Sequence, residues 1–127
     1  MIVADSSVLI PWAEGLITDR TDLVQSHLEQ RSLFIVPISI TELLSARDLR
    51  PEIRVVAETL NLLELTEGYW ARAGLLRGKC LAAGRRARMA DTLIAQACLD
   101  ANLPLLTDDA DFAVFQFIGG LKLVELD

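Results

Sequence analysis

Short apolar segments alternate with longer segments of helical periodicity along this chain, and this alternation is its most constraining feature. The apolar runs lie at Met1–Ala4, Leu33–Val36 and Leu105–Leu106, with further candidates at Leu63–Leu65 and Leu121–Leu126. Continuously apolar strands separated by helices are typical of a parallel sheet that is covered on both faces. We therefore expect an α/β fold, a three-layer α/β/α sandwich around a central parallel sheet.

Helices are predicted between these strands from apolar spacing and from boundary residues. Ser6 or Ser7 is expected to cap a helix over 8–14. Ser39 is expected to open a helix that runs to about residue 47. The remaining helices are predicted over 19–30, from Pro51 to about 62, over 67–83 with Gly84 as its stop, and over 89–101, and a short turn or helix follows residue 108.

Length and composition favour one globular domain over residues 1–127. Hydrophobic residues make up 52% of the chain and supply a core. No apolar run approaches the roughly 18 residues of a membrane helix, so we expect no membrane partner. The segment Met1–Asp5 carries an acid and no Lys or Arg, which is not typical of a signal peptide.

Cysteine and histidine are too scarce for several common kinds of site. The chain has Cys80 and Cys98 as its two cysteines and His27 as its one histidine. This excludes a cysteine/histidine zinc cluster and a disulfide scaffold, and it fits a reducing cytoplasm. A serine or cysteine triad would have to use His27 as its base, which argues against that chemistry.

Basic residues are concentrated in one segment of an acidic chain. Residues 68–90 contain no acid and six basic side chains, so they carry +6 while the whole chain carries −6 and the remainder −12. The overall balance argues against wholesale electrostatic capture of nucleic acid. The polarity nevertheless predicts two surfaces with different partners.

Acidic residues fall where the strands of the expected sheet end or where the neighbouring helices begin. They are Asp5, Glu42, Asp91, Asp108, Asp109 and Asp111. Ligand sites of parallel sheets lie outside the carboxyl ends of the strands, so we expect these carboxylates to converge. Converging carboxylates raise each other's pKa, and a bound cation removes that cost. Oxygen donors without His or Cys indicate Mg²⁺ or Mn²⁺.

Each acid also has a purely structural interpretation. Asp5 would serve as a helix N-cap, and Glu42 would close a capping box with Ser39. Asp91 would stabilise the start of its helix by interaction with the helix dipole, and the acids in 108–111 would cap a turn. These alternatives stay open at the level of the sequence.

Four segments together resemble PIN-domain ribonucleases, and most closely the VapC-type toxins of bacterial toxin–antitoxin pairs. They are Ile2–Ile10 (IVADSSVLI), Ile38–Leu44 (ISITELL), Ala90–Ala95 (ADTLIA) and Leu105–Phe112 (LLTDDADF). The segments occur in the family's order and span the chain. The resemblance implies a PIN-like fold.

The resemblance also implies a set of site residues. Its catalytic quartet is Asp5, Glu42, Asp91 and Asp109, of which Asp5, Asp91 and Asp109 would hold Mg²⁺ or Mn²⁺. Asp109 is preferred to Asp108 because the family pattern places the acid two residues after the threonine. Ser6, Thr107 and Asp111 would support the site.

The implied activity is metal-dependent endoribonuclease cleavage of RNA phosphodiester bonds. Arg85, Arg86 and Arg88 precede the Asp91 helix and would contact RNA phosphates, with a solvated helix face as the alternative. The implied partners are an RNA substrate, a second copy in a homodimer, and an antitoxin protein whose tail crosses the acidic site. The apolar residues of the helices at Leu43, Leu44, Val55, Val56 and Leu60 form either a candidate antitoxin surface or part of the core.

Other classes of protein place carboxylates at similar positions. A response-regulator receiver needs an acidic pair near the first strand, but Ser6 and Ser7 follow Asp5. An aspartyl-phosphate phosphatase needs a second Asp where Ser7 stands. A non-catalytic PIN-like module that binds RNA or protein is disfavoured by the intact quartet. The aromatic residues Trp12, Tyr69 and Trp70 are expected to pack in the core or an interface rather than to stack on bases.

Overall fold

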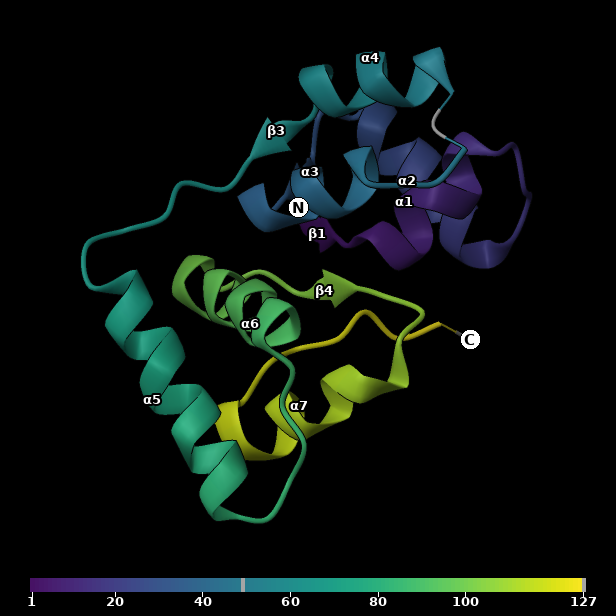
Figure 1. Cartoon of the computed structure of the whole chain (residues 1–127). Coiled ribbons are helices and arrows are strands. Elements are labelled where there is room, and N and C mark those ends of the chain that lie inside the picture. The colour runs from purple at the N-terminus through teal and green to yellow at the C-terminus, as the bar shows by residue number, and fades with distance from the viewer. Residues whose placement is uncertain (49, 127) are drawn as a thin grey trace.

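A computed structural model of the chain describes residues 1–48 and 50–126, in which the strands form one parallel sheet (Figure 1). The strands are β1 (Ile2–Ala4), β2 (Leu33–Ile35), β3 (Asn61–Leu62) and β4 (Leu105–Leu106), paired in the order β3-β2-β1-β4. All three pairings are parallel. The direction of strand addition reverses at β1. The carboxyl ends of β1 and β4 therefore flank a topological switch point, where open parallel sheets bind ligands.

Helices lie on both sides of the sheet, which confirms the predicted α/β/α sandwich. One side holds α1 (Ser6–Ala13), α2 (Asp19–Glu29), α3 (Pro37–Leu44) and α4 (Pro51–Thr59), and the other holds α5 (Tyr69–Ala82), α6 (Met89–Ala101) and α7 (Ala113–Gly119), as Figure 1 shows. A short 3₁₀ helix, η1 (Ala110–Phe112), joins β4 to α7. None of the helices in the described residues combines the length and the apolar character that a membrane crossing needs.

Alternate side chains of β1 and β4 enter two separate hydrophobic cores. Val3 and Leu105 pack into the core under α5, α6 and α7. Ile2, Ala4 and Leu106 pack into the core under α1, α2 and α4. Successive strand residues point to opposite faces, so strands buried on both faces must be apolar throughout. This requirement explains the continuous apolar runs of the sequence.

Several helix boundaries lie where the sequence predicted them. Pro51 is the first residue of α4, where its missing N–H costs nothing. Gly84 lies just past α5 with a φ of 71°, a conformation that favours glycine. The predicted range 89–101 matches α6 at both ends.

Two predicted strands are wrong in position or extent. The third strand lies at Asn61–Leu62 rather than at 63–65, because its partner β2 ends at Ile35 and the chain then turns into α3. The predicted last strand over 121–126 is reduced to a single bridge between Leu105 and Leu123. The Leu105 N–H donates to the Lys122 carbonyl and the Val124 N–H donates to the Leu105 carbonyl, each at 2.9 Å, so this pairing uses Leu105 alone of the two β4 residues.

The predicted serine caps are also wrong. α1 begins at Ser6, with Asp5 in the N-cap position, so Ser6 and Ser7 are helical residues rather than caps. α3 begins at Pro37, two residues before the predicted Ser39, because the fixed φ of proline suits the first helical position. Glu42 therefore lies in the second turn of α3 and not in the first.

The three aromatic residues that were considered for base stacking have different environments. Tyr69 is buried, as predicted, and its hydroxyl donates a hydrogen bond to the Leu93 carbonyl at 2.6 Å. Trp12 is half-buried and its Nε1 donates to Gln25. Trp70 is 67% exposed, so the core interpretation is wrong for this residue. It lines an apolar pocket of about 480 Å³ between α5 and α6.

Candidate active site

Asp5 is buried at the carboxyl end of β1, with 4% of its surface exposed. Its carboxylate accepts hydrogen bonds from the Ser7 hydroxyl at 2.6 Å and from the Thr107 hydroxyl at 2.7 Å. It accepts no bond as a helix cap, although it occupies the N-cap position of α1. The capping interpretation of Asp5 is therefore wrong. Its side chain instead faces the end of the neighbouring strand β4.

The turn after β4 is held by the same hydroxyl groups. The Thr107 hydroxyl accepts from the Asp109 N–H at 3.1 Å, and the Ser7 hydroxyl accepts from the Asp108 N–H at 2.9 Å. The serine that contacts Asp5 is thus Ser7, whereas the sequence motif assigned Ser6. Asp109 also caps the turn, as its structural interpretation predicted, because it accepts from the Asp111 N–H at 2.9 Å.

Three carboxylates converge beside this turn. Asp91, Asp109 and Asp111 each place a carboxylate oxygen within 4.8 Å of the other two. Two oxygens on one Mg²⁺ lie about 3 to 4.2 Å apart, so carboxylates within this limit are close to the spacing of a shared ion. The expected ligand set of Asp5, Asp91 and Asp109 shares two members with this cluster. Asp111 is the third member of the cluster, and Asp5 lies outside the cluster.

Glu42 faces the other acids from α3 without a cap role. Among the described residues, Glu42 Oε1 and Ser39 Oγ are buried side-chain atoms without a hydrogen-bond partner. The predicted capping box between these two residues is therefore wrong. A buried acceptor without a partner costs about 1–3 kcal/mol, so Glu42 Oε1 is a place for a water, a cation or a substrate group. An all-oxygen donor set with such an open acceptor fits a hard divalent cation.

The acids perturb one another through burial and mutual repulsion. Burial raises the pKa of Asp91 to about 6, with further repulsion from Asp109 and opposition from the Arg88 charge. Burial likewise raises the pKa of Asp5, against the hydrogen bonds from Ser7 and Thr107. The pKa of Glu42 is raised by burial and then by the charges of Asp5 and Asp91. Such a group of raised carboxyl pKa values is typical of functional sites.

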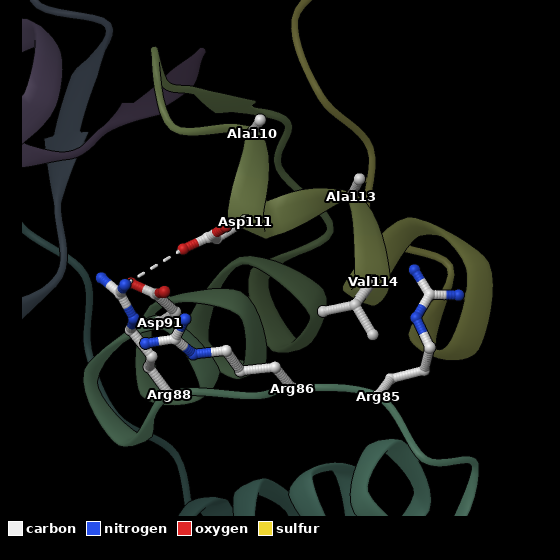
Figure 2. Close-up of a pocket in the computed structure, with 8 residues that line it drawn as sticks. All are labelled: Arg85, Arg86, Arg88, Asp91, Ala110, Asp111, Ala113 and Val114. Carbon is white, nitrogen blue, oxygen red and sulfur yellow. Dashed lines mark ion pairs between the residues drawn. The ribbon is translucent and has the colours of Figure 1, made fainter.

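A pocket of about 180 Å³ opens beside this cluster and is lined by acids and arginines together (Figure 2). Arg88 forms an ion pair with Asp111, with 3.5 Å between the guanidinium nitrogen and the carboxylate oxygen. Figure 2 shows the side chains of Arg86 and Arg88 extending toward Asp91, while Arg85 extends the other way. The basic loop before α6 therefore borders the acidic cluster, as its sequence position suggested.

Arg20 is a residue of this region that no sequence motif singled out. Its Nε donates to the Thr107 carbonyl at 3.2 Å, and its Nη1 lies 3.4 Å from the Asp108 carboxylate. Arg20 lies in the first turn of α2, far from the β4 turn in sequence. Only the packing of the helices against the sheet brings these residues together.

Comparison with known proteins identifies a similar sequence and similar folds. No protein-family model matches the sequence. The chain is 28% identical over 130 residues to "Ribonuclease VapC5" of Mycobacterium tuberculosis (strain ATCC 25618 / H37Rv), with 98% of this chain and 94% of that protein covered.

Solved structures give the same result for the fold. A crystal structure of VapBC2 from Rickettsia felis, bound to a promoter DNA fragment, contains a chain that matches with a TM-score of 0.77 and 18% identity, with both chains fully covered. A chain of VapBC-5 from Mycobacterium tuberculosis matches with a TM-score of 0.68 and 24% identity over 98% of each chain. The chain therefore has the fold of a PIN domain. Its sequence is similar over nearly its whole length to VapC5, as its sequence motifs indicated.

Neutralising Asp91 is expected to stabilise the metal-free protein at neutral pH. A raised carboxyl pKa means that the folded state binds the proton more tightly than the unfolded state does. The carboxylate therefore costs increasing stability as the pH rises from about 4 through about 6. We expect Asp91→Asn to gain roughly 1 kcal/mol at neutral pH, after allowance for solvent screening, or about 3–6 °C in melting temperature. Thermal unfolding in chelator across that pH range measures the effect.

Glu58→Gln is the matched control, because Glu58 is exposed on α4 and its replacement removes the same charge. The difference between the two variants should fade toward acidic pH, where Asp91 is protonated. A lower melting temperature for Asp91→Asn at neutral pH would instead mean that Asp91 mainly stabilises the start of α6.

Proposed function

We propose that this chain, as a single PIN-like domain over residues 1–127, is a metal-dependent endoribonuclease that acts as the toxin of a toxin–antitoxin pair. The observation that carries the proposal is the cluster of Asp91, Asp109 and Asp111 at the switch point of the sheet, with arginines lining the adjoining pocket. Similarity to a VapC ribonuclease over 98% of the chain supports the same activity. The reaction is hydrolysis of an RNA phosphodiester bond.

Mg²⁺ or Mn²⁺ is the cofactor that this donor set favours, because all its ligands are carboxylate oxygens. Asp91 and Asp109 would hold the ion with Asp5, as the motifs imply, and Asp111 would be a further ligand by its place in the cluster. Bound there, the ion would supply Lewis-acid stabilisation of the scissile phosphate and lower the pKa of an attacking water.

Glu42 is the residue that we assign to the attacking water. Its Oε1 lacks a hydrogen-bond partner among the described residues and can accept a bond from water. Its raised pKa makes it a better base near neutral pH than an ordinary glutamate. Glu42 would therefore orient that water or remove its proton.

Arg86 and Arg88 would contact the RNA backbone next to the acids, and Arg85 would extend that contact along the strand; the lining of the pocket supports this role. Four carboxylates alone would repel an RNA phosphate, so positive side chains at the border of the site offset this repulsion. Phosphate contacts of this kind position the substrate and carry no sequence preference by themselves.

Cleavage of RNA by the purified chain is expected to require Mg²⁺ or Mn²⁺ and to stop in excess chelator. Asp5→Asn, Asp91→Asn and Asp109→Asn should each lower the rate by at least about 100-fold, the usual scale for loss of one electrostatic transition-state contact. Asp108→Asn should lower it by less than about 10-fold, because Asp108 is exposed and paired with Arg20. Gel analysis of an end-labelled RNA measures both effects.

Two outcomes of this assay would contradict the proposal. Undiminished cleavage in excess chelator would exclude the metal mechanism. A larger effect at Asp108 than at Asp109 would mean that the motif is aligned one residue out of place. Asp22→Asn, at an exposed position in α2, controls for the loss of one negative charge.

Charge reversal of Arg85, Arg86 and Arg88 to Glu is expected to weaken RNA binding and to flatten its salt dependence. Each lost phosphate contact should reduce the slope of log K against log salt by up to about one unit. Fluorescence anisotropy with labelled RNA in chelator, at several salt concentrations, measures binding without cleavage.

A triple reversal at Arg47, Arg50 and Arg54 is the matched control, because these arginines are exposed in and before α4. An equal loss of slope in both triple variants would indicate a general charge effect. An unchanged slope in the first variant would place RNA elsewhere on the molecule.

We also propose that an antitoxin protein binds the chain and that two copies form a homodimer. Of the candidate antitoxin residues, Leu43 and Leu60 are buried in the core, as one of their two interpretations predicted. Leu44 and Val55 are 38% and 60% exposed and remain available on α3 and α4. The solved relatives are VapBC complexes, which supports a protein partner of this kind.

The paired substitution Leu44→Glu and Val55→Glu is expected to release the antitoxin, because it buries two charges at an apolar contact. Co-purification with a co-expressed antitoxin measures this effect, and light scattering of the free chain should give twice its monomer mass. Phe117→Glu, at an exposed position on α7, is the control. If the paired variant still binds the antitoxin, the binding surface lies elsewhere on the molecule.

A further inference from the structure

We propose that Arg20 is a positioning residue that fixes the turn after β4 and thereby the relative placement of Asp5 and Asp109. Its guanidinium spans this turn, because Nε donates to the Thr107 carbonyl and Nη1 pairs with the Asp108 carboxylate. Arg20 thus joins α2, on one side of the sheet, to the segment that carries the last acidic motif. The effect on metal binding and cleavage rests on the proposed function, but the effect on the turn does not.

Side-chain hydrogen bonds hold the first turn of α2, which carries Arg20. Thr18 and Thr21 form a reciprocal capping box around it: the Thr18 hydroxyl accepts from the Thr21 N–H at 3.1 Å, and the Thr21 hydroxyl accepts from the Thr18 N–H at 2.8 Å. Such a box satisfies the free N–H groups of the first helical turn and orders it. The arginine therefore extends from a fixed base.

The Thr107 carbonyl needs a donor that the sheet does not provide. β4 ends at Leu106, so Thr107 lies beyond the ladder formed with β1. A backbone carbonyl at such a half-buried position is normally paired, and the Arg20 Nε–H supplies the bond. A bond from a charged donor is stronger than one between neutral groups.

Thr107 transmits this placement to the acids on both sides. Its hydroxyl donates to Asp5 at 2.7 Å and accepts from the Asp109 N–H at 3.1 Å. Movement of the Thr107 backbone would therefore alter both contacts at once. Outer residues that orient metal-binding groups in this way commonly affect metal affinity by 10–100-fold.

Arg20 also separates the two neighbouring acids of this motif. Its ion pair holds Asp108 in a position where the side chain is 62% exposed, whereas Asp109 joins the cluster with Asp91 and Asp111. The arginine thus favours the arrangement in which Asp109, and not Asp108, faces the site.

The test compares Arg20→Ala, Arg20→Lys and Asp108→Ala in the full chain. Amide hydrogen exchange at Asp109, measured by NMR in chelator, should be at least about 5-fold faster in Arg20→Ala, because the acceptor of that N–H is no longer fixed. The Kd for Mg²⁺, measured by calorimetry, should rise by about 10–100-fold. Arg20→Lys keeps one donor for the Thr107 carbonyl and should recover part of both effects. Asp108→Ala removes only the ion pair and should change either quantity by less than about 3-fold.

Binding of labelled RNA in chelator distinguishes this role from direct contact with phosphate. A positioning role leaves RNA affinity and its salt slope unchanged in Arg20→Ala. Unaltered exchange at Asp109 in Arg20→Ala would overturn the proposal. If RNA affinity also falls in that variant, Arg20 is a phosphate contact instead. If Arg20→Ala does not fold, the exchange rate at Asp109 in Arg20→Lys decides the same question. Failure of the wild type to bind Mg²⁺ would contradict the proposed function, while the exchange measurement would still decide the role of Arg20.

Discussion

The hydrogen bond from the Thr107 hydroxyl to the buried Asp5 carboxylate is the contact on which the candidate site depends. It joins the ends of β1 and β4, the two strands at the switch point of the sheet. A buried carboxylate would be costly without such donors, and the hydroxyls of Ser7 and Thr107 stabilise its charged form. The same two hydroxyls accept from backbone N–H groups of the following turn, so one small network sets the geometry of both strand ends.

Buried acids lie at the centre of this network, and acids paired with arginines lie at its exposed border. Asp5 and Asp91 lie inside, where burial raises their pKa values, and the outer acids Asp108 and Asp111 pair with arginines. Arginine is suited to this place because it stays charged at every physiological pH. Repulsion among the acids at one sheet edge lowers the stability of the fold, and the packing of the two cores offsets this loss. A divalent cation would reduce the repulsion.

The scaffold needs very little sheet to achieve this arrangement. Its strands are two or three residues long, and helices supply most of the side chains in both cores. Short strands leave their ends close to the helices that follow, so side chains from α1, α3 and α6 reach the same place as the turn after β4. The basic loop before α6 then lies at the border of the acids, which brings the chain's two charge extremes to one pocket.

The sequence by itself determined the parallel sandwich, the bounds of α6 and the run of acids at the strand ends, because these follow from local signals: apolar runs, helical spacing, proline and glycine. Tertiary structure decided the rest. The length of β2 limited β3 to Asn61–Leu62, although the apolar pattern pointed further along the chain. The choice of Ser7 over Ser6 as the partner of Asp5 depends on the rotation of α1, since adjacent helical residues point about 100° apart. The contacts of Arg20 with the turn after β4, and of Asp111 with Asp91 and Arg88, join segments distant in sequence, and no local pattern encodes such distances.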